Sequence, residues 1–162
     1  MSSEPPQTDR PRFRVGQCAT LACIYEATAP KPGNVYRGAD FEDMTYVDLV
    51  TAAVAIAPAM DAAATGQSLG RSVLDSIDAT RRLVGVNCNL GTVLLLAPMA
   101  KVPLDVPLSD GIAAVLRECT PADAADVYEA IRRAQPGGLG RAETADVAGP
   151  PPDDLIAAMR LA

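Results

Sequence analysis

Histidine and tryptophan are both absent from the 162-residue sequence, and only 4% of its residues are aromatic. The lack of histidine removes the commonest general base and the commonest zinc ligand. Any acid–base chemistry must therefore use carboxylates, lysine, tyrosine or water. Because large aromatic side chains are scarce, alanine, leucine, valine and isoleucine must fill the core, and such residues suit closely packed helices.

Positive charge is also scarce. The chain has 14 Lys+Arg against 20 Asp+Glu, a net charge of −6, which argues against a nucleic-acid-binding surface. The N-terminus has no signal-peptide hydrophobic region, and the longest apolar run, TVLLLAPMA, is too short to span a bilayer. We therefore expect a soluble cytoplasmic protein without a membrane span.

The four cysteines do not form a CxxC pair, and their number fits a reducing compartment. Cys18, Cys23 and Cys119 lie in apolar segments with a helical pattern, so we expect buried thiols there. Cys88 lies in a polar connection and is also expected to be inert.

A helical apolar period runs through most of the chain, and no alternating strand pattern of any length occurs. We expect an all-α fold, a compact helical bundle with buried central helices and Gly/Pro-rich connecting loops. Polar, proline-rich residues 1–12 predict a disordered tail, and 13–162 a single all-helical domain. The expected helices span 13–29, 46–64 with a kink at Pro58, 69–84, 92–100, 109–116, 121–134 and 155–162.

Four of these helices carry more specific expectations. Segments 13–29 and 92–100 are apolar nearly all round, which is typical of buried helices. Segment 69–84 is the most clearly amphipathic. Its charged residues are expected to form a solvated face: Arg71, Asp75, Asp78, Arg81 and Arg82. The last helix has apolar residues up to the end of the sequence, so we expect further chain or another subunit to cover it.

Three connections combine glycine with polar residues: PKPGNVYRGADFED at 30–43, NCNLG at 87–91 and PGGLGR at 136–141. Glycine lets a backbone approach a ligand closely, and its N–H groups suit phosphate oxygens. Lys31, Arg37 and Arg141 can add positive charge. None of the three matches a phosphate-loop or dinucleotide fingerprint, so each can also be an ordinary turn.

Three longer segments contain these connections: CIYEATAPKPGNVYRGADFEDMTYVDL, SLGRSVLDSIDATRRLVGVNCNLGTVLLLAPMA and AIRRAQPGGLGRAETADV. In order and spacing they resemble the triphosphoribosyl-dephospho-CoA synthase family, especially its archaeal-type branch. The resemblance runs from about Cys18 to Val147. It implies an all-helical transferase that joins the triphosphoribosyl part of ATP to 3′-dephospho-CoA and releases adenine.

The resemblance also suggests which residues meet the substrates. Lys31 and the Gly33–Asn34 backbone are natural triphosphate anchors. Magnesium usually accompanies ATP through one or two carboxylates, here Asp40 and Asp43, with Glu42 a further possible ligand. The expected nucleotide-binding residues are Lys31, Gly33, Asn34, Arg37, Asn87, Asn89 and Gly91.

Breaking the ribose–adenine bond should build positive charge on the sugar, as in glycoside chemistry. Glu26, Asp40 and Asp43 are the candidates to stabilise that charge or to deprotonate the attacking hydroxyl. The alternatives are structural. Asp40 can form a turn, Asp43 can sit near a helix N-terminus, and Asn87 and Asn89 can cap the following helix.

Two departures from the family pattern keep other functions open. Bacterial members carry N-T-H-K-G at Asn87–Gly91, so Asn89 and Leu90 replace the histidine and lysine. Family members are also considerably longer, and we expect this chain to be truncated at its C-terminal side. It would then act as a homo-oligomer or with a complementary chain. The alternatives are a non-catalytic, partner-dependent nucleotide-binding module and a ribosyl hydrolase.

Overall fold

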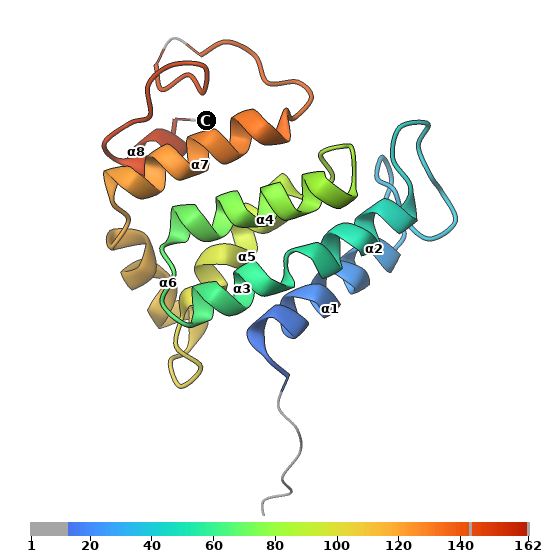
Figure 1. Cartoon of the computed structure of the whole chain (residues 1–162), viewed down its shortest axis with the longest axis horizontal. Coiled ribbons are helices and arrows are strands. Elements are labelled where there is room, and N and C mark those ends of the chain that lie inside the picture. The colour runs from blue at the N-terminus through green and yellow to red at the C-terminus, as the bar shows by residue number, and fades with distance from the viewer. Residues whose placement is uncertain (1–12, 143, 162) are drawn as a thin grey trace, which may run out of the picture.

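The computed structural model describes residues 13–142 and 144–161, so the predicted N-terminal tail lies outside the described residues. Within these ranges the chain forms eight α-helices and no strand, apart from an isolated bridge between Tyr36 and Ala39. The helices are α1 Val15–Thr28, α2 Tyr46–Ala55, α3 Ala57–Ala64, α4 Leu69–Leu83, α5 Leu90–Lys101, α6 Leu108–Arg117, α7 Pro121–Ala134 and α8 Leu155–Met159 (Figure 1). The predicted all-α fold is confirmed.

Local sequence signals explain where several helices begin. Thr45 caps α2 and Thr120 caps α7, each in a reciprocal capping box with an aspartate three residues later. The predicted kink in 46–64 is a full break at Ile56, which separates α2 from α3. Pro58 lies in the first turn of α3, where its missing N–H leaves no helical hydrogen bond unmade.

The central helix of the bundle is α4, which packs against α2, α3, α5 and α7 (Figure 1). Segments 13–29 and 92–100, expected to be buried on all sides, form α1 and α5, and each of these helices buries only one face. In α1, Cys23 is buried but Cys18 is exposed, so the expectation for Cys18 is wrong. In α5, Val93 is buried whereas Leu95 is 64% exposed.

Alanine and glycine in the core allow helix backbones to touch. A Cβ added at Gly70 of α4 would lie 2.5 Å from the Cα of Asp123 in α7. A Cβ at Gly16 of α1 would collide with the carbonyl of Ala57 in α3. Because the core contains few large side chains, the helices can lie close to one another.

Asp123 joins α4 to α7 at this contact. Its carboxylate, in a residue only 5% exposed, accepts hydrogen bonds from the Gly70 N–H at 2.7 Å, the Thr120 N–H at 2.9 Å and the Thr120 hydroxyl at 2.8 Å. Burial alone would raise the pKa of Asp123. The hydrogen bonds outweigh burial and, with the charge of Lys101, hold this pKa below its ordinary value of 3.8. The first turns of α4 and α7 are thereby fixed to each other.

One apolar stretch meets the length and composition of a membrane span. It is Tyr46–Ala64, which comprises α2 and α3. In this structure the stretch belongs to the bundle, where Ala52, Ile56 and Met60 are fully buried. A core helix of a soluble protein passes the same test, so the absence of a membrane span stays a prediction.

We predict that Asp123→Asn lowers the free energy of unfolding by about 2 kcal/mol at pH 7, because a charged acceptor of buried N–H groups is lost. The lowered pKa of Asp123 gives the sign of the pH dependence: its stabilisation is present above about pH 4 and is lost as pH falls through the folded-state pKa. Urea unfolding of both forms from pH 7 to pH 2.5 should show the difference shrinking in acid. A constant difference, or an equal loss in the exposed-site control Asp105→Asn, contradicts this role.

Gly70→Ala should destabilise the protein by about 1–3 kcal/mol, because the added methyl group meets the backbone of Asp123. The matched control is Gly91→Ala in the first turn of α5, where an added Cβ meets nothing within 4 Å. Alanine also favours a helix there, so this control should be neutral or stabilising. Equal thermal midpoints for the two variants would contradict the close packing of α4 on α7.

Candidate functional site

All three glycine-containing connections reach one pocket, of about 350 Å³. We call it the three-loop pocket. Its lining residues are Asp43, Met44, Arg81, Gly85, Val86, Asn87, Ala134, Gln135 and Gly137. Figure 1 shows why these segments meet: the connection 29–45, the turn after α4 and the C-terminal end of α7 lie at the same end of the bundle.

The later part of the first connection brings one carboxylate to this pocket. Asp43 lines it, is exposed, and makes no side-chain hydrogen bond within the described ranges. Asp40 does not line it. One carboxylate oxygen of Asp40 accepts a hydrogen bond from the Tyr46 N–H at 2.7 Å, so this residue holds the start of α2. Of the two predicted metal-binding carboxylates, Asp43 is the one at the pocket.

The earlier part of the first connection is bound to α1 instead. Lys31 forms an ion pair with Glu26, and neither residue lines the three-loop pocket. The Asn34 N–H donates to the Lys31 carbonyl at 3.3 Å, and the Asn34 side-chain oxygen accepts from the Val35 N–H. Gly33 has a φ of 73°, the left-handed conformation that glycine allows in such a turn. The structure therefore does not bring Lys31 and Glu26 together with Asp43.

Val35 and Arg37, also in the first connection, lie in opposite environments. Val35 is fully buried and anchors the loop to the bundle, which the polar character of the segment did not suggest. Arg37 is exposed beside the isolated bridge and does not line the three-loop pocket.

The second connection contributes two asparagines in different environments. Asn87 lines the three-loop pocket, and its side-chain oxygen accepts from the Leu90 N–H at 3.3 Å, so it also helps to start α5. Asn89 is 8% exposed, and its Nδ2 donates to the Thr80 hydroxyl at 2.9 Å. Its Oδ1 is buried without a hydrogen-bond partner in the described part of the chain. Gly91 is exposed, in the first turn of α5.

Cys88, between the two asparagines, has a strongly raised pKa of about 11. Burial is the main cause, and the nearby carboxylate of Asp48 in α2 adds to it. Because a thiol with this pKa is protonated at neutral pH, Cys88 is a poor nucleophile. This result supports the prediction that it is inert.

The donors at this end of the bundle are too few to hold a metal ion unaided. Within residues 13–142 and 144–161, no group of three or more Cys, Asp or Glu side chains is close enough to bind one. Mg²⁺ bound with a nucleotide needs only one or two protein carboxylates, because phosphates and water supply its other ligands. Asp43 fits that arrangement.

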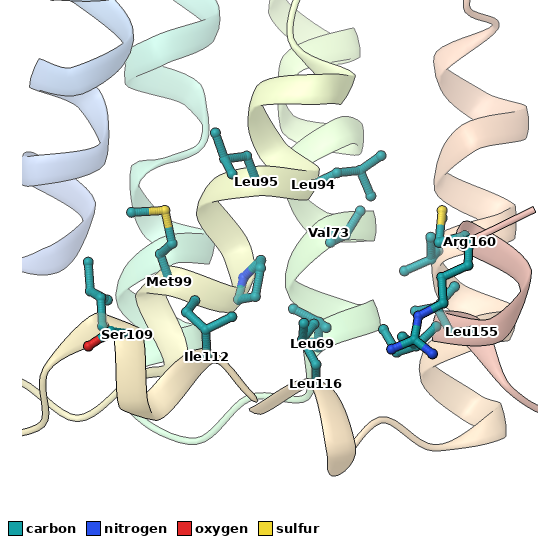
Figure 2. A pocket seen from close by; sticks show the side chains of 15 residues that line it. Leu69, Val73, Leu94, Leu95, Met99, Ser109, Ile112, Leu116, Leu155 and Arg160 are labelled. Atoms are coloured by element: carbon teal, nitrogen blue, oxygen red, sulfur yellow. The ribbon is translucent and has the colours of Figure 1, made fainter. Parts of the chain in front are cut away.

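A second, larger hollow of about 710 Å³ is the apolar groove between α5 and α8. Figure 2 shows Leu95 and Met99 on one side, Leu155 and Arg160 on the other, and Leu69 between them. Among the described residues that line it, none is an aspartate or a glutamate. It includes Ile156 and Met159, part of the apolar face predicted for the last helix.

Sequence reasoning missed two polar residues of the three-loop pocket. Arg81 is exposed, as expected for the solvated face of its helix, and it also lines this pocket near the end of α4. Gln135 ends α7 with a φ of 50°, in the left-handed conformation. The available signal was the position of Arg81 in the last turn of α4, shortly before a turn that contains Gly85.

Comparison with known proteins gave one result. The model of the CitG family, described as ATP:dephospho-CoA triphosphoribosyl transferase, matches residues 12–162. No curated protein and no solved structure matched the chain significantly.

We predict that Cys88 is alkylated by iodoacetamide at pH 8 about 100-fold more slowly than a thiol of ordinary pKa, because its pKa is raised from 9.0 to about 11. Peptide mapping by mass spectrometry should find the exposed Cys18 modified first. In urea the two cysteines should react at similar rates. Equal rates in the folded protein would contradict the raised pKa of this partly buried thiol.

Proposed function

The chain belongs to the ATP:dephospho-CoA triphosphoribosyl transferase family, and we propose that it carries out this transfer at the three-loop pocket. We choose this pocket because each of the three glycine-containing connections contributes one residue to its lining: Asp43, Asn87 and Gly137. These connections lie far apart in the sequence, and each combines glycine with polar residues that can meet a phosphate.

The reaction exchanges one bond to a sugar carbon for another. The bond between C1′ of the ATP ribose and the adenine nitrogen breaks, and adenine leaves with that electron pair and takes up a proton. A hydroxyl oxygen of dephospho-CoA bonds to C1′ and gives up its proton. Positive charge builds on the ribose in between, so a carboxylate beside C1′ lowers the barrier.

Among the three predicted catalytic carboxylates, the local contacts favour Asp43. Glu26 is paired with Lys31, and Asp40 holds the start of α2. Asp43 lies in the same pocket as Asn87 and has no hydrogen-bond partner within the described residues. We assign it the stabilisation of the sugar charge or the uptake of the hydroxyl proton. Asn87 would orient the ribose or the adenine through its amide nitrogen.

Magnesium is part of the proposal. Bound with ATP, the ion would neutralise the phosphates. Its predicted protein ligands are Asp40 and Asp43 in the connection before α2, and of these only Asp43 lines the three-loop pocket. Cytoplasmic location and assembly into a homo-oligomer, or with a complementary chain, stay predictions. Exposed apolar residues beside the apolar groove, such as Leu95 and Met159, are compatible with such assembly.

The test is liquid chromatography of free adenine after mixing the protein with ATP, MgCl₂ and dephospho-CoA. We predict that Asp43→Asn lowers adenine release at least about 100-fold, the scale expected for loss of a positioned base or charge stabiliser. Asp105→Asn, which removes an exposed carboxylate in the connection before α6, should retain wild-type activity.

Three outcomes would contradict the proposal. Full activity of Asp43→Asn would exclude this carboxylate. Adenine release that needs no dephospho-CoA would indicate a ribosyl hydrolase. ATP binding without adenine release in any condition would indicate a non-catalytic module. A fourth measurement distinguishes the two roles proposed for Asp43: a raised magnesium requirement in Asp43→Asn would assign this residue to the metal ion rather than to the sugar.

A further inference from the structure

A polar hollow of about 670 Å³ adjoins the three-loop pocket, between the C-terminal halves of α4 and α7. We call it the arginine pocket. Its lining residues are Asp78, Arg81, Arg82, Glu129, Arg132, Arg133 and Gln135. Arg81 and Gln135 line both pockets, so the two hollows share a wall.

The charges around the arginine pocket do not balance. Four arginines face two carboxylates there, although the whole chain carries a net charge of −6. Both carboxylates are already engaged. Arg133 binds Asp78 at 2.6 Å and Glu129 at 2.8 Å, and Arg132 binds Glu129 at 3.1 Å.

Arg81 and Arg82 form no ion pair within the described residues, so two guanidinium groups remain to meet an anion. Cations in the last turn of a helix complement its dipole, which accounts for these residues on α4 taken alone. The same dipole effect covers Arg132 and Arg133 in the last turn of α7, but those two arginines are paired with carboxylates, whereas the two of α4 are not, in the part of the chain that the structure describes. A guanidinium group offers parallel N–H donors that match phosphate oxygens, and two neighbouring groups suit a chain of phosphates.

Lys31, the phosphate anchor expected from the sequence, is instead held by Glu26 outside both pockets. Arg81 is the one cationic side chain among the residues that line the three-loop pocket. We propose that the polyphosphate chain of the nucleotide binds Arg81 and extends over Arg82 into the arginine pocket, while the ribose occupies the three-loop pocket. The nucleotide's identity rests on the proposed function, whereas the recognition of a polyphosphate rests on the arginines.

Inorganic tripolyphosphate is the probe, because it has neither sugar nor base and cannot react. Isothermal titration at low salt should show binding to the wild-type protein, and Arg81→Gln should raise the dissociation constant about 10-fold or more, as for a lost charge-assisted hydrogen bond. Arg81→Lys should restore part of the affinity. The matched control is Arg117→Gln, which removes a last-turn arginine of α6 outside both pockets and should change the constant by less than about 2-fold.

The inference is overturned if the wild type does not bind tripolyphosphate, if Arg81→Gln binds as well as wild type, or if Lys31→Gln alone causes the loss. Adenine assays separate this inference from the proposed function. Transfer activity with an unchanged KM for ATP in Arg81→Gln would contradict the arginine site and leave the transferase intact. Arg81-dependent binding of tripolyphosphate without adenine release would support the site and contradict the transferase.

Discussion

The contact between α4 and α7 sets the relative position of the two helices whose ends line both polar pockets. A buried carboxylate, that of Asp123, accepts the Gly70 N–H, and the absence of a side chain on Gly70 lets the two backbones touch. This fixes the two helices to each other near their first turns. Their opposite ends then carry Arg81 and Gln135 to the wall shared by the two polar pockets.

The low aromatic content, the lack of histidine and the negative net charge of the chain each have a counterpart in this structure. With few aromatic side chains, the helices pack through alanine and glycine, and short distances between backbones replace large side chains as the source of precise placement. With no histidine, acid–base chemistry must use carboxylates, lysine, tyrosine or water, and the proposed transfer assigns it to a carboxylate. With a net charge of −6, a polyphosphate needs a local excess of positive charge or a divalent cation, and the arginine pocket holds such an excess.

The features that the sequence predicted well are those that nearby residues determine. The helical class follows from the apolar period, and the starts of α2 and α7 follow from Thr45 and Thr120 with their partner aspartates. The three connections were recognisable from glycine and polar composition, but their meeting at one pocket depends on how α4 packs against its neighbours.

The failures are long-range as well. The exposure of Cys18 depends on the outer position of α1, and the presence of Arg81 in a pocket depends on α7, which lies far along the chain. The pairing of Lys31 with Glu26 shows how a plausible ligand anchor can be engaged by the protein itself. Apart from the position of Arg81 near a glycine-containing turn, these contacts leave no local sequence signal.

The most direct test of the central claim is hydrogen–deuterium exchange with and without magnesium and ATP, in the absence of an acceptor. If the packing of α4 on α7 assembles one nucleotide site, amides in 43–46, 81–89 and 134–138 should gain protection together. Protection confined to 31–37, or to the apolar groove around Leu95 and Leu155, would contradict the account.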